Sequence, residues 1–149
     1  MPRPSTIPRV LIAAALLVLL PGCGQGGIEF KDPWIPLAPP NVTVLAGYLT
    51  IVNDTPEALV FTHAVSDVFD AVEFHRTEAT GDVLRMVRQL QLEVQAHSRF
   101  DLVPGGHHLM LLNPVAPLSE GQNVAITLIT RDGAETAIQF TTRRPEFRL

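Results

Sequence analysis

Short apolar segments recur along most of this chain, and they constrain its fold more than any other feature. From Val42 onward the segments have the length of β-strands, several alternate apolar and polar residues, and turn signals such as NDTP, ATGD, VPGG, LSEG and RDGA separate them. No stretch has the periodicity of an amphipathic helix of about ten residues or more. About seven or eight such strands predict an all-β fold, an antiparallel Greek-key β-sandwich or barrel. With 149 residues, we expect a single domain.

The N-terminus has the pattern of a secretion signal. Arg3 and Arg9 precede an unbroken apolar stretch over 10–20, and small residues follow around Cys23. The apolar stretch is well short of the roughly 20 residues that span a bilayer, so we expect no permanent transmembrane helix. The sequence LPGC at 20–23 resembles the lipobox of bacterial lipoproteins, where the signal is removed just before a cysteine that receives acyl chains.

Cleavage at the lipobox would make Cys23 the first residue of an extracytoplasmic, lipid-anchored protein. The single cysteine agrees with this, because the chain has no partner for an intramolecular disulfide. Plain secretion, with Cys23 left as an unmodified thiol, is the alternative. We therefore expect a signal peptide of the lipoprotein type over 1–22, a lipid-anchored flexible tether over 23–33, a β-sandwich domain over 34–142 and a polar tail over 143–149.

Charge and missing motifs exclude several classes of function. Removal of 1–22 takes away Arg3 and Arg9 and no acidic residue, so the formal charge moves from -4 to -6. We therefore expect no nucleic-acid partner, and membrane attachment only through the lipid on Cys23. The chain also lacks a Gly-x-Ser-x-Gly motif, a phosphate loop, a dinucleotide fingerprint and a cysteine paired with histidine. We expect a protein that is not an enzyme.

Methionine is rare in this chain and lies near histidine. Apart from Met1 the sequence holds only Met86 and Met110, while Leu, Ile and Val fill the other apolar positions. Methionine is therefore not used as a general filler of core gaps. Because residues two apart on a strand share a face, His108 and Met110 would project together and could reach one ion. Met86 follows His75 in the same region of the chain.

Alternation also assigns a face to His75. In AVEFHRT, Val72 and Phe74 take the presumed core face, so Glu73 and His75 take the other, where we expect His75 to be exposed. Two imidazoles and two thioethers form a soft, neutral ligand set that selects Cu(I), whereas zinc prefers thiolate or carboxylate beside histidine. The residues alone leave alternatives open, since a methionine in a strand is most often core and a lone histidine most often plain surface.

The spacing of these residues resembles a known family. Ten residues separate His75 from Met86, and twenty-one residues separate Met86 from His108-Leu109-Met110. This spacing is similar to the metal-binding pattern of bacterial periplasmic copper chaperones of the PCu(A)C type. Further segments also resemble that family across nearly the whole domain: Trp34, AGYLTIVN at 46–53, PGGHHLMLLN at 104–113 and PLSEG at 117–121.

The resemblance implies a cupredoxin-like β-sandwich that binds one Cu(I) per chain. Its ligands would be His75, Met86, His108 and Met110 on an exposed rim, which makes 34–142 a copper-binding domain. The resemblance also implies that the chaperone passes its copper to a cytochrome c oxidase subunit or to the assembly factors of that enzyme. The tail holds no His or Met, so we expect a single site.

Other residues lie near the motif or are histidines outside it. Arg76 stands where many relatives have Glu or Thr, and its guanidinium would add positive charge beside the site. His107 is shifted to the opposite face and is an alternative or indirect ligand, while Glu73 could orient the His75 imidazole. His63 and His97 match no motif position, so we expect them at the surface or at strand ends. The alternative function is a cell-surface β-sandwich lipoprotein, structural or protein-binding, without a metal role.

Overall fold

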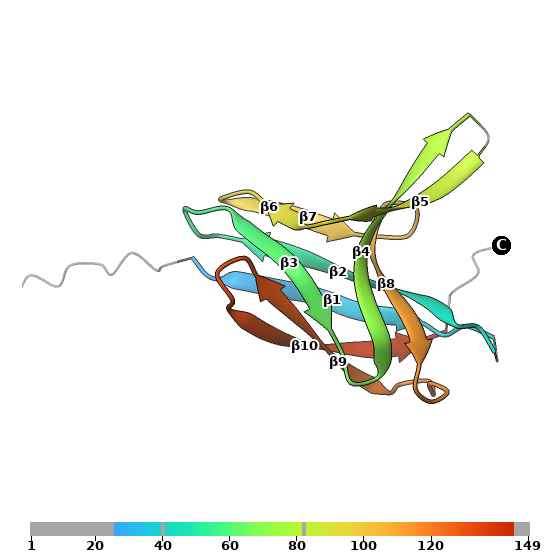
Figure 1. Ribbon diagram of the computed structural model, residues 1–149. Coiled ribbons are helices and arrows are strands. Elements are labelled where there is room, and N and C mark those ends of the chain that lie inside the picture. Colours follow the sequence, from blue (N-terminus) through green and yellow to red (C-terminus); the bar gives the residue numbers. More distant parts are fainter. Residues whose placement is uncertain (1–25, 40, 82, 145–149) are drawn as a thin grey trace, which may run out of the picture.

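The computed structural model describes residues 26–39, 41–81 and 83–144. Among these residues there are β-strands and no helices (Figure 1). This confirms the all-β prediction; the proposed signal peptide, Cys23 and most of the tail lie outside the described residues. Within those residues no helix is long and apolar enough to cross a membrane. The strands are β1 (Ile28–Pro36), β2 (Val44–Asn53), β3 (Leu59–Val65), β4 (Phe69–Thr80), β5 (Val83–Gln89), β6 (Leu92–Val94), β7 (Ser98–Leu102), β8 (His107–Pro114), β9 (Asn123–Thr130) and β10 (Glu135–Arg143).

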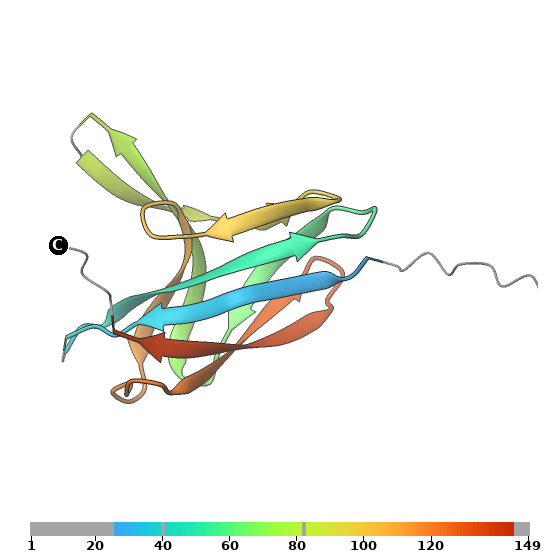
Figure 2. The same cartoon turned by 180° about the vertical axis from the view of Figure 1, so that it is seen from behind.

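The strands form one sheet that closes into a barrel (Figures 1 and 2). Their order is β5-β4-β8-β7-β2-β1-β10-β9-β3-β6, and β8 also pairs directly with β2. The pairing of Ala64 on β3 with Val72 on β4 closes the ring. β5 and β6 stand at the two ends of this order, outside the closed ring.

The sheet is mixed, which corrects the prediction of a purely antiparallel one. β1 pairs with β10 in parallel, and β7 pairs with β8 in parallel through Leu102 and His107. The other pairings are antiparallel. Alternation in a sequence predicts which face a side chain takes, but it does not specify which strand becomes the neighbour.

The barrel interior holds the alternate apolar residues of the strands. Val72 and Phe74 on β4 lie opposite Leu111 and Leu109 on β8, and all four are buried. Burying each side chain of this size contributes roughly 1.5–3 kcal/mol relative to leaving it exposed. The remaining core comes from the other strands and includes Ile35, Leu49, Ile51, Phe61, Leu102, Val124, Ile126, Leu128 and Phe140.

The β4–β5 hairpin projects from the barrel wall (Figure 1). It turns at Gly81, whose φ of 62° lies in the left-handed region that glycine adopts without strain. In the described structure β5 pairs with β4 alone. Leu84 and Met86 on β5 are therefore largely exposed, at 72% and 63%.

The ordered domain begins before the predicted boundary at Trp34. β1 starts at Ile28, which pairs with Asn53 on β2, so 28–33 belong to the barrel and not to a tether. The pairing shifts register between Lys31 and Trp34, and Asp32 has a φ of 48°. This irregularity breaks the alternation of apolar and polar residues, which is why the sequence pattern does not reveal the strand.

Candidate metal centre

The pairing of β4 with β8 brings three of the four predicted ligands onto one face. His75 lies directly opposite His108, and Glu73 lies directly opposite Met110. Paired residues share a face in an antiparallel sheet, and so do residues two apart on one strand. His75, His108 and Met110 therefore project on the side of the sheet that faces away from the core.

The pairing of β4 with β5 adds the fourth residue. Thr77 lies opposite Met86 and His75 lies opposite Arg88, without a register shift along the hairpin. Met86 is thus on the same face as His75, one diagonal step along the neighbouring strand. It is largely exposed on the projecting hairpin, whereas Met110 is half-buried in the barrel wall.

The two histidines form the closest part of this cluster. Their ring centroids are 5.9 Å apart and the ring planes are inclined by 36°. Both side chains are buried, with 8% of His75 and 4% of His108 exposed. The face of His75 was predicted correctly but its exposure was not, because the side chains of Glu73 and His108 contact it from the same strand and from β8.

Each imidazole has one nitrogen in a hydrogen bond and one without a partner. His75 Nε2 lies 2.9 Å from Glu73 Oε2, and His108 Nδ1 lies 3.1 Å from the Gly106 carbonyl oxygen. The other two nitrogens, His75 Nδ1 and His108 Nε2, are buried and have no hydrogen-bond partner. Across the described residues they are the only buried side-chain nitrogen or oxygen atoms in that condition.

These contacts fit a pair of metal-binding imidazoles. A carbonyl and a carboxylate accept hydrogen bonds, so they assign the protons to His108 Nδ1 and His75 Nε2 and leave lone pairs on the other nitrogens. A buried polar atom without a partner costs about 1–3 kcal/mol. Metal-bound histidines have this arrangement, in which one nitrogen holds the ion and the other is held by the protein. Together with the thioethers of Met86 and Met110, they form a soft donor set.

Arg88 completes the surroundings of His75 and is the residue that our sequence reasoning missed. Arg88 Nη1 lies 3.2 Å from Glu73 Oε1, so each carboxylate oxygen of Glu73 has one partner. The ATGD turn could have revealed the position of Arg88. A hairpin that turns near Gly81 has a register that brings Arg88 opposite His75. The suggestion that Glu73 contacts the imidazole agrees with the structure.

Arg76 and His107 lie on the opposite face of the sheet. They pair directly with each other across β4 and β8, and Arg76 forms an ion pair with Glu78. His107 packs edge-on against Phe100, with ring centroids 4.9 Å apart. Burial, followed by the charges of Arg76 and His108, lowers the pKa of His107. The guanidinium on the ligand face is therefore that of Arg88, and the predicted placement of Arg76 beside the site is wrong.

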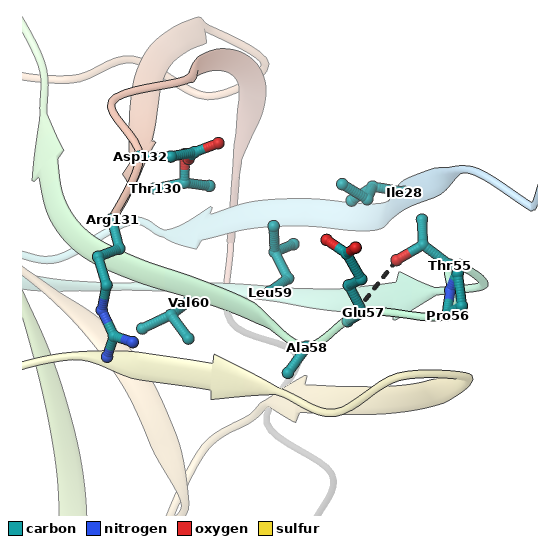
Figure 3. Close-up of a pocket in the computed structure, with 10 residues that line it drawn as sticks. All are labelled: Ile28, Thr55, Pro56, Glu57, Ala58, Leu59, Val60, Thr130, Arg131 and Asp132. Carbon is teal, nitrogen blue, oxygen red and sulfur yellow. Dashed lines mark hydrogen bonds between the residues drawn. The ribbon is translucent and has the colours of Figure 1, made fainter.

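The remaining histidines and a pocket near the start of β1 lie apart from this centre. His63 and His97 are exposed, as predicted. A pocket of about 530 Å³ lies between the start of β1, the segment that joins β2 to β3 and the turn that joins β9 to β10 (Figure 3). It contains no histidine, methionine or cysteine, and its lining is Ile28, Thr55–Val60 and Thr130–Asp132.

Comparison with known protein families shows which family the chain belongs to. The model of a family described as "Putative lipoprotein LpqE-like" matches residues 28–142. The chain belongs to this LpqE-like family. One similar protein is "Putative lipoprotein Lxx21020" of Leifsonia xyli subsp. xyli, 24% identical over 152 residues, which cover 93% of this chain and 90% of that protein. Another is "Uncharacterized protein RP573" of Rickettsia prowazekii, 26% identical over 127 residues, or 80% of this chain and 67% of that protein.

Solved structures confirm the fold of this LpqE-like protein. The "Copper-bound PCuAC domain from PmoF2" superposes with a TM-score of 0.68 at 23% identity, over 81% of this chain and 96% of that one. Apo-DR1885 from Deinococcus radiodurans, solved in solution, gives a TM-score of 0.63 at 22% identity, over 98% of this chain and 97% of that one. The barrel is therefore the one that the sequence resemblance to PCu(A)C proteins implied.

Proposed function

We propose that this LpqE-like protein is an extracytoplasmic copper chaperone that binds one Cu(I) through His75, Met86, His108 and Met110. The two buried imidazole nitrogens without partners are the observation that carries this proposal. They lie on the face that also carries both methionines. The fold supports it further, since its structural neighbours include the copper-bound domain from PmoF2 and a solution structure of CuI-DR1885.

The chemistry of the donors favours Cu(I) as the cargo. Thioether sulfur is a soft ligand that selects Cu(I) among the biological metal ions, and neutral imidazole binds copper well. Two imidazoles and two thioethers are neutral donors, and the nearby carboxylate of Glu73 is already paired with Arg88. The charge of the ion is therefore not neutralised by its ligands, which favours release over permanent binding. Met86, being largely exposed, offers the side from which a recipient's ligand can replace a donor of the site.

The proposed location follows from the N-terminus and from the family. The LPGC sequence provides a cysteine for lipid attachment at Cys23. The family description and the name of the Leifsonia xyli relative both contain the word lipoprotein. We place the mature protein outside the cytoplasm on a lipid anchor. From the resemblance to PCu(A)C proteins, we propose assembly of cytochrome c oxidase as the destination of the copper.

A titration with Cu(I) in the presence of a competing chelator tests the proposal. The mature protein should take up one equivalent, and a Met86→Leu, Met110→Leu double variant should lose this binding. Leucine conserves the side-chain volume, so the fold should be retained. The His63→Gln variant is the matched control, because it removes an exposed histidine away from the site and should bind normally.

Thermal unfolding provides a second, independent measurement. A ligand that binds only the native state raises the apparent stability, so Cu(I) should raise the Tm of the wild type and not that of the double variant. Unchanged copper uptake in the double variant would contradict the proposed site. A wild-type Tm that is indifferent to copper would instead favour a structural or protein-binding surface lipoprotein.

A further inference from the structure

We propose that Glu73 is a positioning residue that makes Nδ1 the metal-facing nitrogen of His75, and that Arg88 holds Glu73 in place for this purpose. This inference rests on the proposed function, because it concerns the same centre. It adds a chain of contacts, Arg88 to Glu73 to His75, that connects the edge strand β5 with a ligand on β4.

The geometry of Glu73 supports this role. Its Oε2 accepts a hydrogen bond of 2.9 Å from His75 Nε2, and its Oε1 faces Arg88 Nη1 at 3.2 Å. The side chain of Glu73 is only 20% exposed, compared with 64% for Arg88. Both carboxylate oxygens are thus used, which fixes the orientation of the group. An imidazole that donates from Nε2 keeps its lone pair on Nδ1. In His75, Nδ1 is the nitrogen that is buried without a hydrogen-bond partner.

The two histidines are held in different ways. His108 donates from Nδ1 to a backbone carbonyl, that of Gly106, so its tautomer is set by the path of the main chain. The tautomer of His75 depends instead on one side chain, Glu73. The centre therefore presents Nε2 of His108 and Nδ1 of His75 to an ion. Of the two tautomers, only that of His75 depends on side chains of β4 and β5 through a hydrogen bond.

Arg88 extends this dependence to the strand that carries Met86. The two residues lie two positions apart on β5, so they share a face and move together. A displacement of β5 would withdraw the Met86 thioether and would also remove the cation that orients Glu73. Loss of one ligand and loosening of another are thereby coupled within a single hairpin.

Two variants of Glu73 separate orientation from simple packing. Glu73→Ala removes the acceptor, while Glu73→Gln retains an acceptor oxygen but removes the charge. The control is Glu78→Ala, because Glu78 lies on the same strand and also pairs with an arginine two positions away, Arg76, but on the opposite face. Far-UV circular dichroism and thermal unfolding of the copper-free proteins establish that each variant is folded.

The first readout is the tautomer of His75 in the copper-free protein, measured by long-range ¹H–¹⁵N NMR of the imidazole rings. We expect a proton on Nε2 in the wild type, Glu73→Gln and Glu78→Ala, and a substantial Nδ1-protonated population in Glu73→Ala. A wild-type His75 protonated on Nδ1, or a tautomer unaffected by Glu73→Ala, overturns the proposal. This measurement requires no copper, so it stands even if the proposed function fails.

The second readout is the Cu(I) affinity measured by chelator competition. Removal of a group that orients a metal ligand typically weakens binding by about 10- to 100-fold, and we expect this for Glu73→Ala. Glu73→Gln should recover most of the loss, Arg88→Gln should show a smaller loss, and Glu78→Ala should match the wild type. Equal losses in Glu73→Ala and Glu78→Ala would overturn the positioning role, whereas a wild type without Cu(I) binding would refute the proposed function.

Discussion

β8 and β5 lie on either side of β4, and each carries one methionine of the candidate centre. β8 pairs with β4, β2 and β7, and its Leu109 and Leu111 are fully buried in the core. β5 pairs with β4 alone in the described structure and leaves Met86 largely exposed. Strands with few buried contacts open at lower free energy than core strands. The candidate centre therefore combines a fixed half on β8 with a more easily opened half on β5.

The strongest test of the fixed half is removal of His108. This imidazole is buried, and it is held by the main chain beside His75. We expect His108→Ala to abolish Cu(I) binding in a chelator competition, because one of two nitrogen donors is lost and the neighbouring His107 lies on the opposite face of the sheet. An exposed histidine, His97, serves as the control, and retained binding by His108→Ala would remove β8 from the site.

Unfolding by urea compares the two strands as parts of the fold. Leu111→Ala on β8 should lower the free energy of unfolding by about 2–5 kcal/mol, since it creates a cavity in the core. Leu84→Ala on β5 should change it by no more than about 0.5 kcal/mol, as expected for an exposed side chain. Similar losses in both variants would contradict the distinction between the halves.

The two methionines should differ in their contribution to affinity. Met110 is half-buried in the barrel wall, whereas Met86 must be ordered from an exposed position before it can bind. Ordering a flexible side chain opposes binding. We expect Met110→Leu to weaken Cu(I) binding more than Met86→Leu does, as measured by chelator competition on the single variants. The reverse order would mean that β5 is the better-organised half.

The smallest expected effect concerns the dynamics of the strands. Amide hydrogen exchange of the copper-free protein should be faster along β5 than along β8, and Cu(I) should slow exchange mainly in β5. Binding that orders a segment increases its protection. Exchange measured by NMR or mass spectrometry would show this, and equal protection of both strands before copper addition would count against it.

The sequence predicts the faces of the strands well and their surroundings poorly. Alternation correctly assigns Phe74 to the core and His75 to the other face, because it reports only a period of two. It does not show that His75 is buried, since this depends on Glu73 and on His108 from a strand far along the chain. Alternation also puts Arg76 on the face of Phe74, so the guanidinium that we expected beside the site points to the other side of the sheet.

The alternation of apolar and polar residues also does not predict which strands pair or where each strand begins. The parallel pairing of β1 with β10 joins the two ends of the domain, and nothing local in either segment specifies it. β1 itself is hidden by the irregularity at Asp32 and by a proline in its middle. The position of Arg88 opposite His75 was accessible, because the Gly81 turn fixes the register of a hairpin, but only if that turn is used to count residues across it.

The direction in which β1 enters the barrel bears on how the protein would stand on a membrane. β1 begins at the end of the barrel opposite the β4–β5 hairpin (Figures 1 and 2). A strand rises about 3.3 Å per residue, so β1 alone spans about 30 Å. With a lipid on Cys23, as proposed, only a short leader would separate the membrane from Ile28. The β4–β5 hairpin, which carries Met86, would then lie at the end of the barrel that is farther from the membrane.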